Sequence, residues 1–205
     1  MVLDTVHPLA PAEAAGSVAW LVRHGESTWN ALGLAQGQSD QPRLTRRGAR
    51  QARYVANQLC GRPIGAVCAS DLRRAAATAA PLATALGLAV SHDPRLRERG
   101  LGVLEGTRSV AVPAALSGVA GNRVIDRDAR PPEGESLRDL YWRVADFAGD
   151  VLAPGGPREV AIVAHGGTLR VLTAYLRGIP VERMAWEPIA NGCVVRLQPN
   201  QHSYS

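Results

Sequence analysis

Short apolar runs alternate with amphipathic helical stretches along most of the chain. Short apolar runs that end at a turn predict buried parallel strands, and these runs occupy residues 18–23, 64–70 and 159–165. Apolar residues at helical spacing predict helices, and these occupy residues 45–60, 71–86, 136–152 and 168–177. The alternation of strands and helices is typical of an α/β domain with a mostly parallel sheet.

Local signals refine the ends of these elements. Thr45 and Ser136 are expected to cap the helices that follow them, because a hydroxyl accepts a hydrogen bond from a free backbone N–H at a helix start. Pro81 has no N–H, so we expect it to start a new segment or to kink the helix around it. Shorter apolar stretches predict two further strands, at 89–92 and 189–197.

The remaining segments lack a clear period. Residues 1–17 are rich in Ala and Pro and are expected to form a flexible leader, so that a single domain covers 18–205. Residues 95–106 carry Gly and charge, as a surface or active-site loop does. Residues from about 107 to 134 hold only a weak helical pattern, and we expect a small lid that faces the substrate.

The basic residues of the chain are all arginine. The 23 residues counted as Lys or Arg are Arg without exception, which excludes every mechanism that needs a lysine, such as a Schiff base or a P-loop contact to a nucleotide. The formal charge of +5 and the high isoelectric point favour anionic partners but do not choose among them. Arginine suits phosphate and carboxylate groups, because its planar fork donates to two oxygens at once.

Cysteine usage and hydropathy point to a reducing compartment. The three cysteines, Cys60, Cys68 and Cys193, have no spacing that suggests a disulfide framework or a zinc site. The chain shows no signal-peptide pattern and no apolar run of about 18 residues, the length that predicts a membrane span. We therefore expect a soluble cytoplasmic protein with no membrane partner.

Two predicted strands end in the same way. LVRHG and IVAHG each deliver a histidine, His24 and His165, to a glycine turn at the carboxyl end of the strand. Ligands of open parallel sheets bind beyond these strand ends. Arg23 and Arg74 are expected at the same edge, where so much positive charge would be repulsive without an anion to offset it. The pattern favours a phosphate site.

Six ordered motifs carry a specific resemblance. With LVRHGESTWN at 21–30, the chain is similar to the histidine phosphatase superfamily, whose fold resembles phosphoglycerate mutase. The motifs that follow in the family's order are GxxD (37–40) with LTxxG (44–48), SDLxRAxxTA (70–79), LRExxxGxxEG (96–106), PEGES (132–136) and VAHGG (163–167). The resemblance implies a three-layer α/β/α fold with a mostly parallel central sheet and a small lid insertion.

The resemblance also implies a division of roles. His24 would be the nucleophile that forms a phosphohistidine, and Arg23, Arg74 and His165 would hold the phosphoryl oxygens. Glu98 would protonate the leaving oxygen and then activate water. These roles agree with the needs of phosphoryl transfer, which depends on positioning and on stabilising spread negative charge.

Further residues are implied at the phosphate or leaving group, namely Asn30, Gln36 and Gly166. No third or fourth ligand accompanies the two histidines at a usable spacing, so we expect no metal and no cofactor. Arg73 is interpreted as a surface or supporting charge, because the arginine of the SDLxRAxxTA motif is its neighbour Arg74.

The function we predict is hydrolysis of a small phosphorylated metabolite. Residues 107–124 are short and apolar, with two arginines, whereas mutases of this kind carry more basic residues there to retain a bisphosphorylated intermediate. Phosphoglycerate mutase activity and a non-catalytic phosphate-binding protein remain the alternatives, and a homodimer stays open.

Nucleic acid is not expected as a partner, because the arginines are scattered and no binding motif occurs. Three arginines near the predicted lid, Arg99, Arg127 and Arg130, are interpreted as exposed surface residues, with recognition of an acidic substrate group as the alternative.

Overall fold

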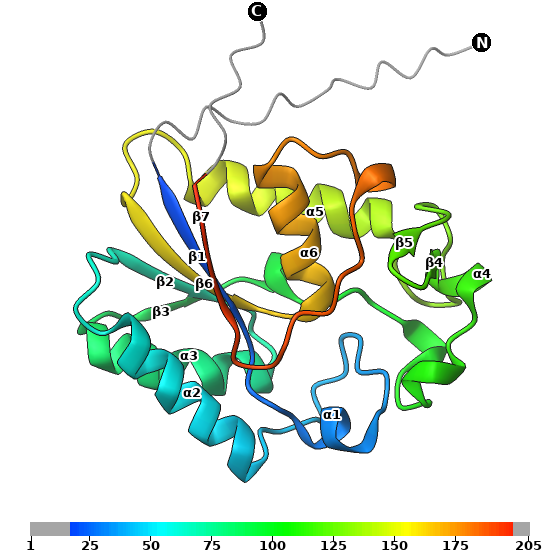
Figure 1. The fold of residues 1–205 in the computed structure, drawn as a ribbon, viewed down its shortest axis with the longest axis horizontal. Coiled ribbons are helices and arrows are strands. Elements are labelled where there is room, and N and C mark those ends of the chain that lie inside the picture. The colour runs from blue at the N-terminus through cyan, green and yellow to red at the C-terminus, as the bar shows by residue number, and fades with distance from the viewer. Residues whose placement is uncertain (1–16, 199–205) are drawn as a thin grey trace, which may run out of the picture.

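A computed structural model describes residues 17–198 of the chain as a three-layer α/β/α domain (Figure 1). The central sheet has five strands in the order β3-β2-β6-β1-β7. The strands are β1 (Val18–Arg23), β2 (Ala66–Ala69), β3 (Val90–His92), β6 (Glu159–Ala164) and β7 (Val194–Leu197). The first four are parallel to one another, and β7 pairs with β1 in the antiparallel direction. The predicted fold class is confirmed.

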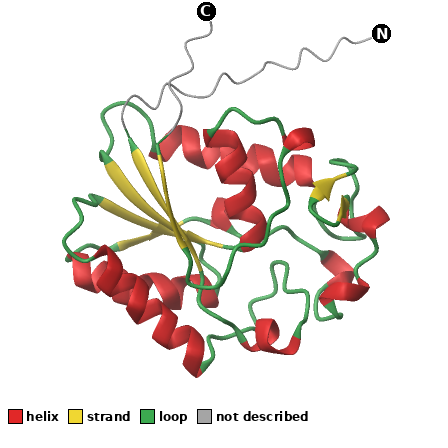
Figure 2. Ribbon diagram, in the orientation of Figure 1, coloured by secondary structure: helices red, strands yellow, loops and turns green. Residues whose placement is uncertain are grey.

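Two helices cover each face of the sheet (Figure 2). One face carries α2 (Arg46–Leu59) and α3 (Arg73–Leu86), and the other carries α5 (Leu137–Val151) and α6 (Gly166–Leu176). Because side chains alternate across a strand, Val18, Trp20 and Val22 of β1 pack on the α2 and α3 side, and Ala19 and Leu21 pack on the other. Every strand of the centre is therefore buried on both faces, as its apolar sequence predicts.

The helix starts follow the capping rules. The hydroxyl of Thr45 accepts a hydrogen bond from the N–H of Gly48 at the start of α2. Ser136 and Asp139 form a reciprocal capping box at the start of α5. Pro81 lies inside α3, which runs unbroken from Arg73 to Leu86, so the expected new segment is wrong. Buried residues on both sides of the proline pack into one core cluster, which stabilises the continuous helix.

The region from 107 to 134 forms a small outlying unit at the end of α5 (green in Figure 1). It contains a 3-10 turn, η3 (Ser109–Ala111), a short helix, α4 (Ala114–Ser117), and a hairpin of β4 (Val119–Ala120) and β5 (Arg123–Val124). Three more 3-10 turns lie elsewhere, and they are η1 (Pro94–Leu96), η2 (Gly102–Leu104) and η4 (Val181–Arg183).

Some boundaries differ from the predicted ones. A short helix, α1 (Thr28–Leu32), follows β1 where no helix was predicted. The last strand begins at Val194, so residues 189–193 form a loop that reaches the end of β1. The α6 helix begins two residues earlier than predicted, directly after His165. The expected leader lies outside the described residues, apart from Ser17.

Candidate active site

The carboxyl ends of three adjacent strands bring the site together. His24 follows β1, Ser70 follows β2, and His165 follows β6, which lies between them in the sheet. The imidazole rings of the two histidines meet edge to face, with centroids 5.1 Å apart. Both histidines and Ser70 are buried. The two strand-end histidines are thus neighbours, as their matching sequence context predicts.

The imidazole of His24 is held in one tautomer. Its Nδ1 lies 2.7 Å from the carbonyl oxygen of Gly25, which can only accept, so Nδ1–H is the donor and Nε2 carries the free lone pair. Burial, with Arg74 nearby, lowers the pKa of His24 to about 3. His24 is therefore neutral at physiological pH, which is the state that a nucleophilic imidazole needs.

His165 presents Nδ1 to the site, in contrast to His24, which presents Nε2. Its Nε2 lies 2.9 Å from the hydroxyl of Ser70, while its Nδ1 is buried without a hydrogen-bond partner among the described residues. Burial, then the charge of Arg74, lowers the pKa of His165 well below its usual value. With the Ser70 hydroxyl donating to Nε2, the neutral ring carries its proton on Nδ1 and offers one donor to the site.

Within the described residues, Arg23 and Arg74 each have a buried Nε without a hydrogen-bond partner. The terminal nitrogens of the fully buried Arg74 donate to the carbonyls of Ser39 and Gly37, at 2.7 and 2.8 Å, while its Nε has no partner. Arg23 donates through Nη1 to the carbonyl of Ile189, and its Nε likewise has no partner in the described part of the chain. Burial lowers the pKa of Arg74 to about 10, so its guanidinium stays charged at neutral pH.

The unpartnered buried atoms coincide with the predicted site. Among the described residues, the buried side-chain nitrogens and oxygens without a hydrogen bond are Nε of Arg23, Nε of Arg74 and Nδ1 of His165. Buried polar groups are almost always satisfied, and three such exceptions on neighbouring strand and helix ends indicate a ligand-binding site. An anion with several acceptor oxygens fits donors from two guanidinium groups and an imidazole.

Glu98 approaches the same edge from the loop after η1. Its two carboxylate oxygens accept hydrogen bonds from the N–H groups of Gly167 and Thr168, at 3.0 and 3.2 Å, in the first turn of α6. The positive end of the helix stabilises a carboxylate there. A Cβ on Gly167 would overlap Oε1 of Glu98, so glycine at this position makes the close approach of Glu98 possible.

A half-buried ion pair positions the loop that carries Glu98. Arg143 of α5 donates to the carbonyl oxygens of Arg95, Arg97 and Glu98 and pairs with Glu135 at 2.6 Å. The other side of the loop is held because Glu135 accepts a hydrogen bond from the N–H of Gly100. Sequence reasoning missed Arg143, because its helical position alone does not show that it faces loop carbonyls.

Asn30 and Gln36 meet at the hydroxyl of Ser27, which has one proton to donate and lies within hydrogen-bond distance of Oε1 of Gln36, at 2.7 Å, and of Oδ1 of Asn30, at 3.1 Å. The N–H of Ser27 also donates to Oδ1 of Asn30. Their amide oxygens are thus engaged within the loop beyond β1. Asn191, which sequence reasoning also missed, donates to the carbonyl of His24 and to Oδ1 of Asn30, at 3.0 and 3.1 Å. Its loop reaches the site because β7 pairs with β1.

Gly166 is the first residue of α6 and lies at the same edge. The position of a Cβ on Gly166 would be 3.6 Å from Nε of Arg23 and 3.2 Å from Nη1 of Arg170. Arg170 was not recognised from the sequence. The signal available was its spacing, since residues four apart in a helix share a face.

The interpretation of Arg99 as an exposed residue is wrong. Arg99 is only 5 % exposed, and its guanidinium donates to backbone carbonyls of the 107–134 unit and its flank, including those of Ala129 and Glu135 at 2.7 Å. The same contacts engage Nε and both Nη nitrogens of Arg99, so its guanidinium is directed at backbone carbonyls rather than at a substrate acid. Arg127 pairs with Glu182.

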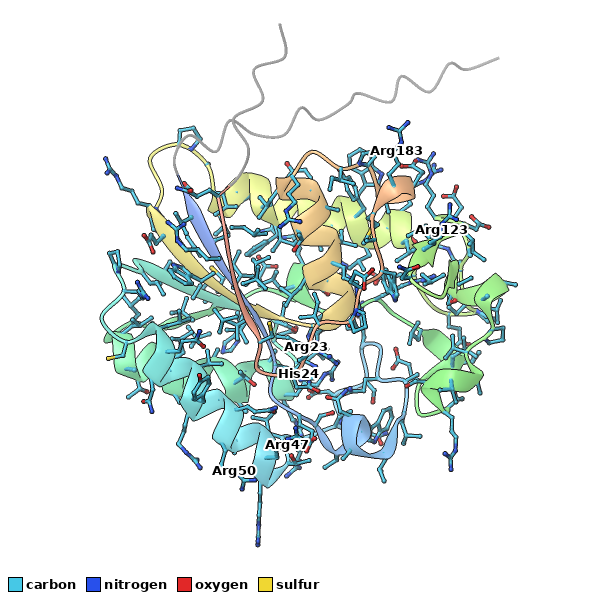
Figure 3. All side chains as sticks on the ribbon, viewed as in Figure 1. Arg23, His24, Arg47, Arg50, Arg123 and Arg183 are labelled. Atoms are coloured by element: carbon cyan, nitrogen blue, oxygen red, sulfur yellow. The ribbon has the colours of Figure 1, made fainter. Side chains whose placement is uncertain are left out.

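Arg130 and Arg73 agree with a surface role. More than half of the Arg130 side chain is exposed, and it pairs with Asp139 at 2.6 Å. Arg73 is 60 % exposed and pairs with Asp40, in contrast to the fully buried Arg74 beside it. Figure 3 shows Arg23 and His24 together at the end of β1, while Arg47 and Arg50 project outward from α2.

Residues 17–198 hold neither a cluster of metal-binding side chains nor a helix that could span a membrane. In that part of the chain, no group of three or more His, Cys, Asp or Glu side chains is placed to hold a metal ion. No helix there is both long enough and apolar enough to cross a membrane.

Comparisons with known proteins agree on one family. The chain is 41% identical over 163 residues to a protein of Enterobacter sp. (strain 638) named "Probable phosphoglycerate mutase GpmB", covering 78% of this chain and 75% of that protein. Its fold matches a mycobacterial glucosyl-3-phosphoglycerate phosphatase with a TM-score of 0.77 and 32% identity, covering 89% of this chain and 92% of the other. It also matches the alpha-ribazole phosphatase of Shigella flexneri, with a TM-score of 0.74 and 30% identity over 90% and 91% of the two chains.

The sequence model of the family described as "Histidine phosphatase superfamily (branch 1)" matches residues 19–205, nearly the whole chain. The six motifs and the site at the sheet edge lie within this match. The chain therefore belongs to branch 1 of the histidine phosphatase superfamily and is an enzyme of that family.

Proposed function

We propose that this enzyme hydrolyses a phosphomonoester of a small metabolite through a phosphohistidine on His24. The observation that carries the proposal is the set of three buried, unpartnered donors from Arg23, Arg74 and His165 beside the histidine with a free Nε2. A phosphoryl group bound by these donors supplies the acceptors that they lack. One neighbour in the same family, the mycobacterial glucosyl-3-phosphoglycerate phosphatase, has a solved complex with inorganic phosphate.

In the first step, the lone pair on Nε2 of His24 attacks phosphorus and the bond from phosphorus to the ester oxygen breaks. Glu98 in its acid form gives its proton to the leaving oxygen, so the alcohol departs neutral. The imidazole keeps its proton on Nδ1 and becomes cationic as Nε2 binds phosphorus. The carbonyl of Gly25, which accepts that N–H at 2.7 Å, stabilises the added charge.

In the second step, the Glu98 carboxylate removes a proton from water, and the resulting hydroxide attacks the phosphohistidine. The bond from phosphorus to Nε2 breaks, its electron pair returns to the ring, and inorganic phosphate leaves. Arg23 and Arg74 offset the negative charge on the phosphoryl oxygens in both steps. Groups already held by carbonyls and packing need no reorganisation during reaction, which is the source of this kind of stabilisation.

Hydrolysis rather than mutase chemistry is favoured by the cations of the 107–134 unit. Arg127 and Arg130 pair with acidic side chains, and Arg108 and Arg123 are exposed. When the dephosphorylated molecule dissociates before it can attack the phosphohistidine, the phosphoryl group on His24 is transferred to water. The name of the Enterobacter relative supports the mutase as the second candidate, and the named activities of the two structural neighbours support the phosphatase.

The test is turnover of p-nitrophenyl phosphate in the presence of a chelator, comparing the parent with His24→Ala. We expect release of phosphate by the parent, loss of turnover in the variant, and a parent phosphoenzyme that survives alkali and decays in acid. An inert parent would support the non-catalytic alternative, and an active His24→Ala variant would contradict the phosphohistidine.

The mutase alternative is tested with 3-phosphoglycerate. Hydrolysis produces inorganic phosphate and glycerate, which can be followed by ³¹P spectroscopy. Formation of the 2-isomer at a rate above that of phosphate release would overturn the assignment as a phosphatase.

A further inference from the structure

Arg170 lies beside the proposed phosphate site but outside the set of residues that the mechanism uses. It belongs to α6, one turn after Gly166, and Glu98 caps the same first turn of this helix. Nη1 of Arg170 and Nε of Arg23 lie within 3.2 and 3.6 Å of the position that a Cβ on Gly166 would take. The two guanidinium groups therefore face the same small space, which glycine leaves open.

The guanidinium of Arg170 is fixed in place. It lies over the ring of Trp186, with its central carbon 4.7 Å from the ring centroid, and its Nε donates to the carbonyl of Glu187 at 2.5 Å. No described residue accepts a hydrogen bond from its two Nη atoms. The guanidinium group is thus held through its Nε and through its stacking on Trp186, while its two Nη groups remain available as donors.

The position of Arg170 relative to Glu98 indicates which part of a substrate it meets. The donors of Arg23, Arg74 and His165 mark the phosphoryl group, and Glu98 protonates the oxygen that leaves. Arg170 interacts electrostatically with Glu98, Arg23 and Glu187, from the helix turn after the one that holds the Glu98 carboxylate. The segment that holds Arg170 faces the 107–134 unit, because Trp186 donates its N–H to the carbonyl of Asn122 and Glu187 accepts from the Asn122 amide. A group that extends from the phosphoryl site past Arg23 to Arg170 therefore belongs to the leaving alcohol.

The charges of the site favour an anionic group there. When Glu98 carries the proton that it gives to the leaving oxygen, it is neutral, and so are the two buried histidines. The guanidinium groups of Arg23, Arg74 and Arg170 then face a phosphoryl dianion. Glu187 also lies near Arg170, but no described carboxylate accepts a hydrogen bond from the Nη atoms of Arg170, so this fork lacks a bonded partner. A carboxylate or second phosphate on the alcohol supplies that partner, and the planar fork of arginine matches it.

We propose that Arg170 determines specificity by binding an anionic group on the leaving alcohol, so that the preferred substrates are phosphomonoesters with a second acidic group. This inference rests on the proposed function. It is not required by that function, because hydrolysis of a phosphomonoester needs no second acid.

The experiment compares two substrates that differ at one group. 3-Phosphoglycerate carries a carboxylate where glycerol 3-phosphate carries a hydroxymethyl group. We expect the parent to have the higher kcat/KM for 3-phosphoglycerate. In Arg170→Met the ratio of the two kcat/KM values should fall about tenfold or more, since a charged hydrogen bond contributes at least this much. The fall should arise mainly in KM for 3-phosphoglycerate.

Two further variants keep the result interpretable. Arg170→Lys retains the charge but loses the fork, and we expect an intermediate ratio. Arg50→Met removes an exposed arginine that projects away from the site and should keep the parent's ratio (Figure 3). Thermal unfolding of each variant separates loss of recognition from loss of the fold.

The outcomes distinguish the two proposals. A parent that does not hydrolyse p-nitrophenyl phosphate refutes the proposed function. A parent that hydrolyses it but shows equal kcat/KM for both glycerol derivatives refutes only the role of Arg170. An equal loss on both substrates in Arg170→Met also overturns the inference, because it would place Arg170 on the phosphoryl group.

Discussion

His24 and Gly25 share a hydrogen bond that determines which nitrogen of the imidazole can react. Because the Gly25 carbonyl accepts from Nδ1 at 2.7 Å, the lone pair is on Nε2. Burial keeps the ring neutral, with its pKa lowered to about 3. The same contact therefore fixes the tautomer of the proposed nucleophile, while the surrounding core fixes its charge.

The first prediction concerns stability against pH. Between about pH 3 and 6.5, the unfolded chain binds a proton at His24 that the folded chain does not bind, so the free energy of unfolding falls as pH falls through this window. The contribution is about 1.4 kcal/mol per pH unit. In His24→Asn, urea denaturation between pH 4 and 6 should show a slope shallower by this amount.

The control for this measurement is His92→Asn, which removes an exposed histidine and should keep the parent's slope. An unchanged slope in His24→Asn would show that His24 is protonated in the folded protein. It would then not be a neutral nucleophile at the lower end of this range.

The second prediction concerns phosphate as a ligand. Inorganic phosphate should stabilise the parent against unfolding, by about 2.7 kcal/mol at one hundred times its Kd, because it binds only the folded site. Arg74→Met removes a buried donor and should abolish most of this gain, as measured by thermal unfolding with and without phosphate.

Arg73→Met is the matched control, because Arg73 is adjacent in sequence, largely exposed and paired with Asp40. It should retain the full gain from phosphate. If both variants lose it equally, the effect reflects general charge rather than the buried donor.

The positions of His24 and His165 could be predicted from the sequence because they depend on strong local patterns. Each follows an apolar run that can only be a buried strand, and parallel strands end at the same edge of a sheet. Only the SDLxRAxxTA motif indicated that Arg74, and not the adjacent Arg73, belongs to the phosphate site. Burial then follows from the helical face, because Arg74, Ala75 and Thr78 of α3 are all buried.

Arg99 and Asn191 could not be placed in this way, because their partners are distant in the sequence. Arg99 is buried by carbonyls at residues 116–117, 129 and 135, which converge only when the 107–134 unit folds. Asn191 reaches His24 only because β7 adds to the sheet beside β1. Neither contact is signalled by a periodic pattern in the local sequence. The short helix α1 was missed because five residues carry too little periodicity to detect.

The third prediction concerns Gly167 and the proton given to the leaving group. In Gly167→Ala the new Cβ would overlap Oε1 of Glu98 and displace the carboxylate. We expect kcat/KM for an alkyl phosphate, whose alkoxide needs a proton, to fall about a hundredfold. The fall for p-nitrophenyl phosphate should be much smaller, because p-nitrophenolate departs without one.

Gly149→Ala is the control, since a Cβ on this α5 glycine meets nothing within 4 Å. It should leave both substrates unaffected and stabilise the fold by about 0.5–1 kcal/mol, as alanine does in a helix. An equal fall on both substrates in Gly167→Ala would argue against Glu98 as the acid.

The fourth prediction concerns Arg99 as the residue that holds the 107–134 unit to the domain. Its guanidinium donates to the carbonyls of Leu116, Ser117, Ala129 and Glu135, and these lose their donor in Arg99→Met. A loss of about 3 kcal/mol is expected, since hydrogen bonds from a charged donor are among the stronger ones. Amide hydrogen exchange in residues 107–134 should therefore accelerate about a hundredfold, while that of β1 and β6 changes less. Arg108→Met, which removes an exposed arginine of the same unit, should leave exchange unchanged. Equal protection of 107–134 in both variants would show that the unit is held by its other contacts with α5 and η4.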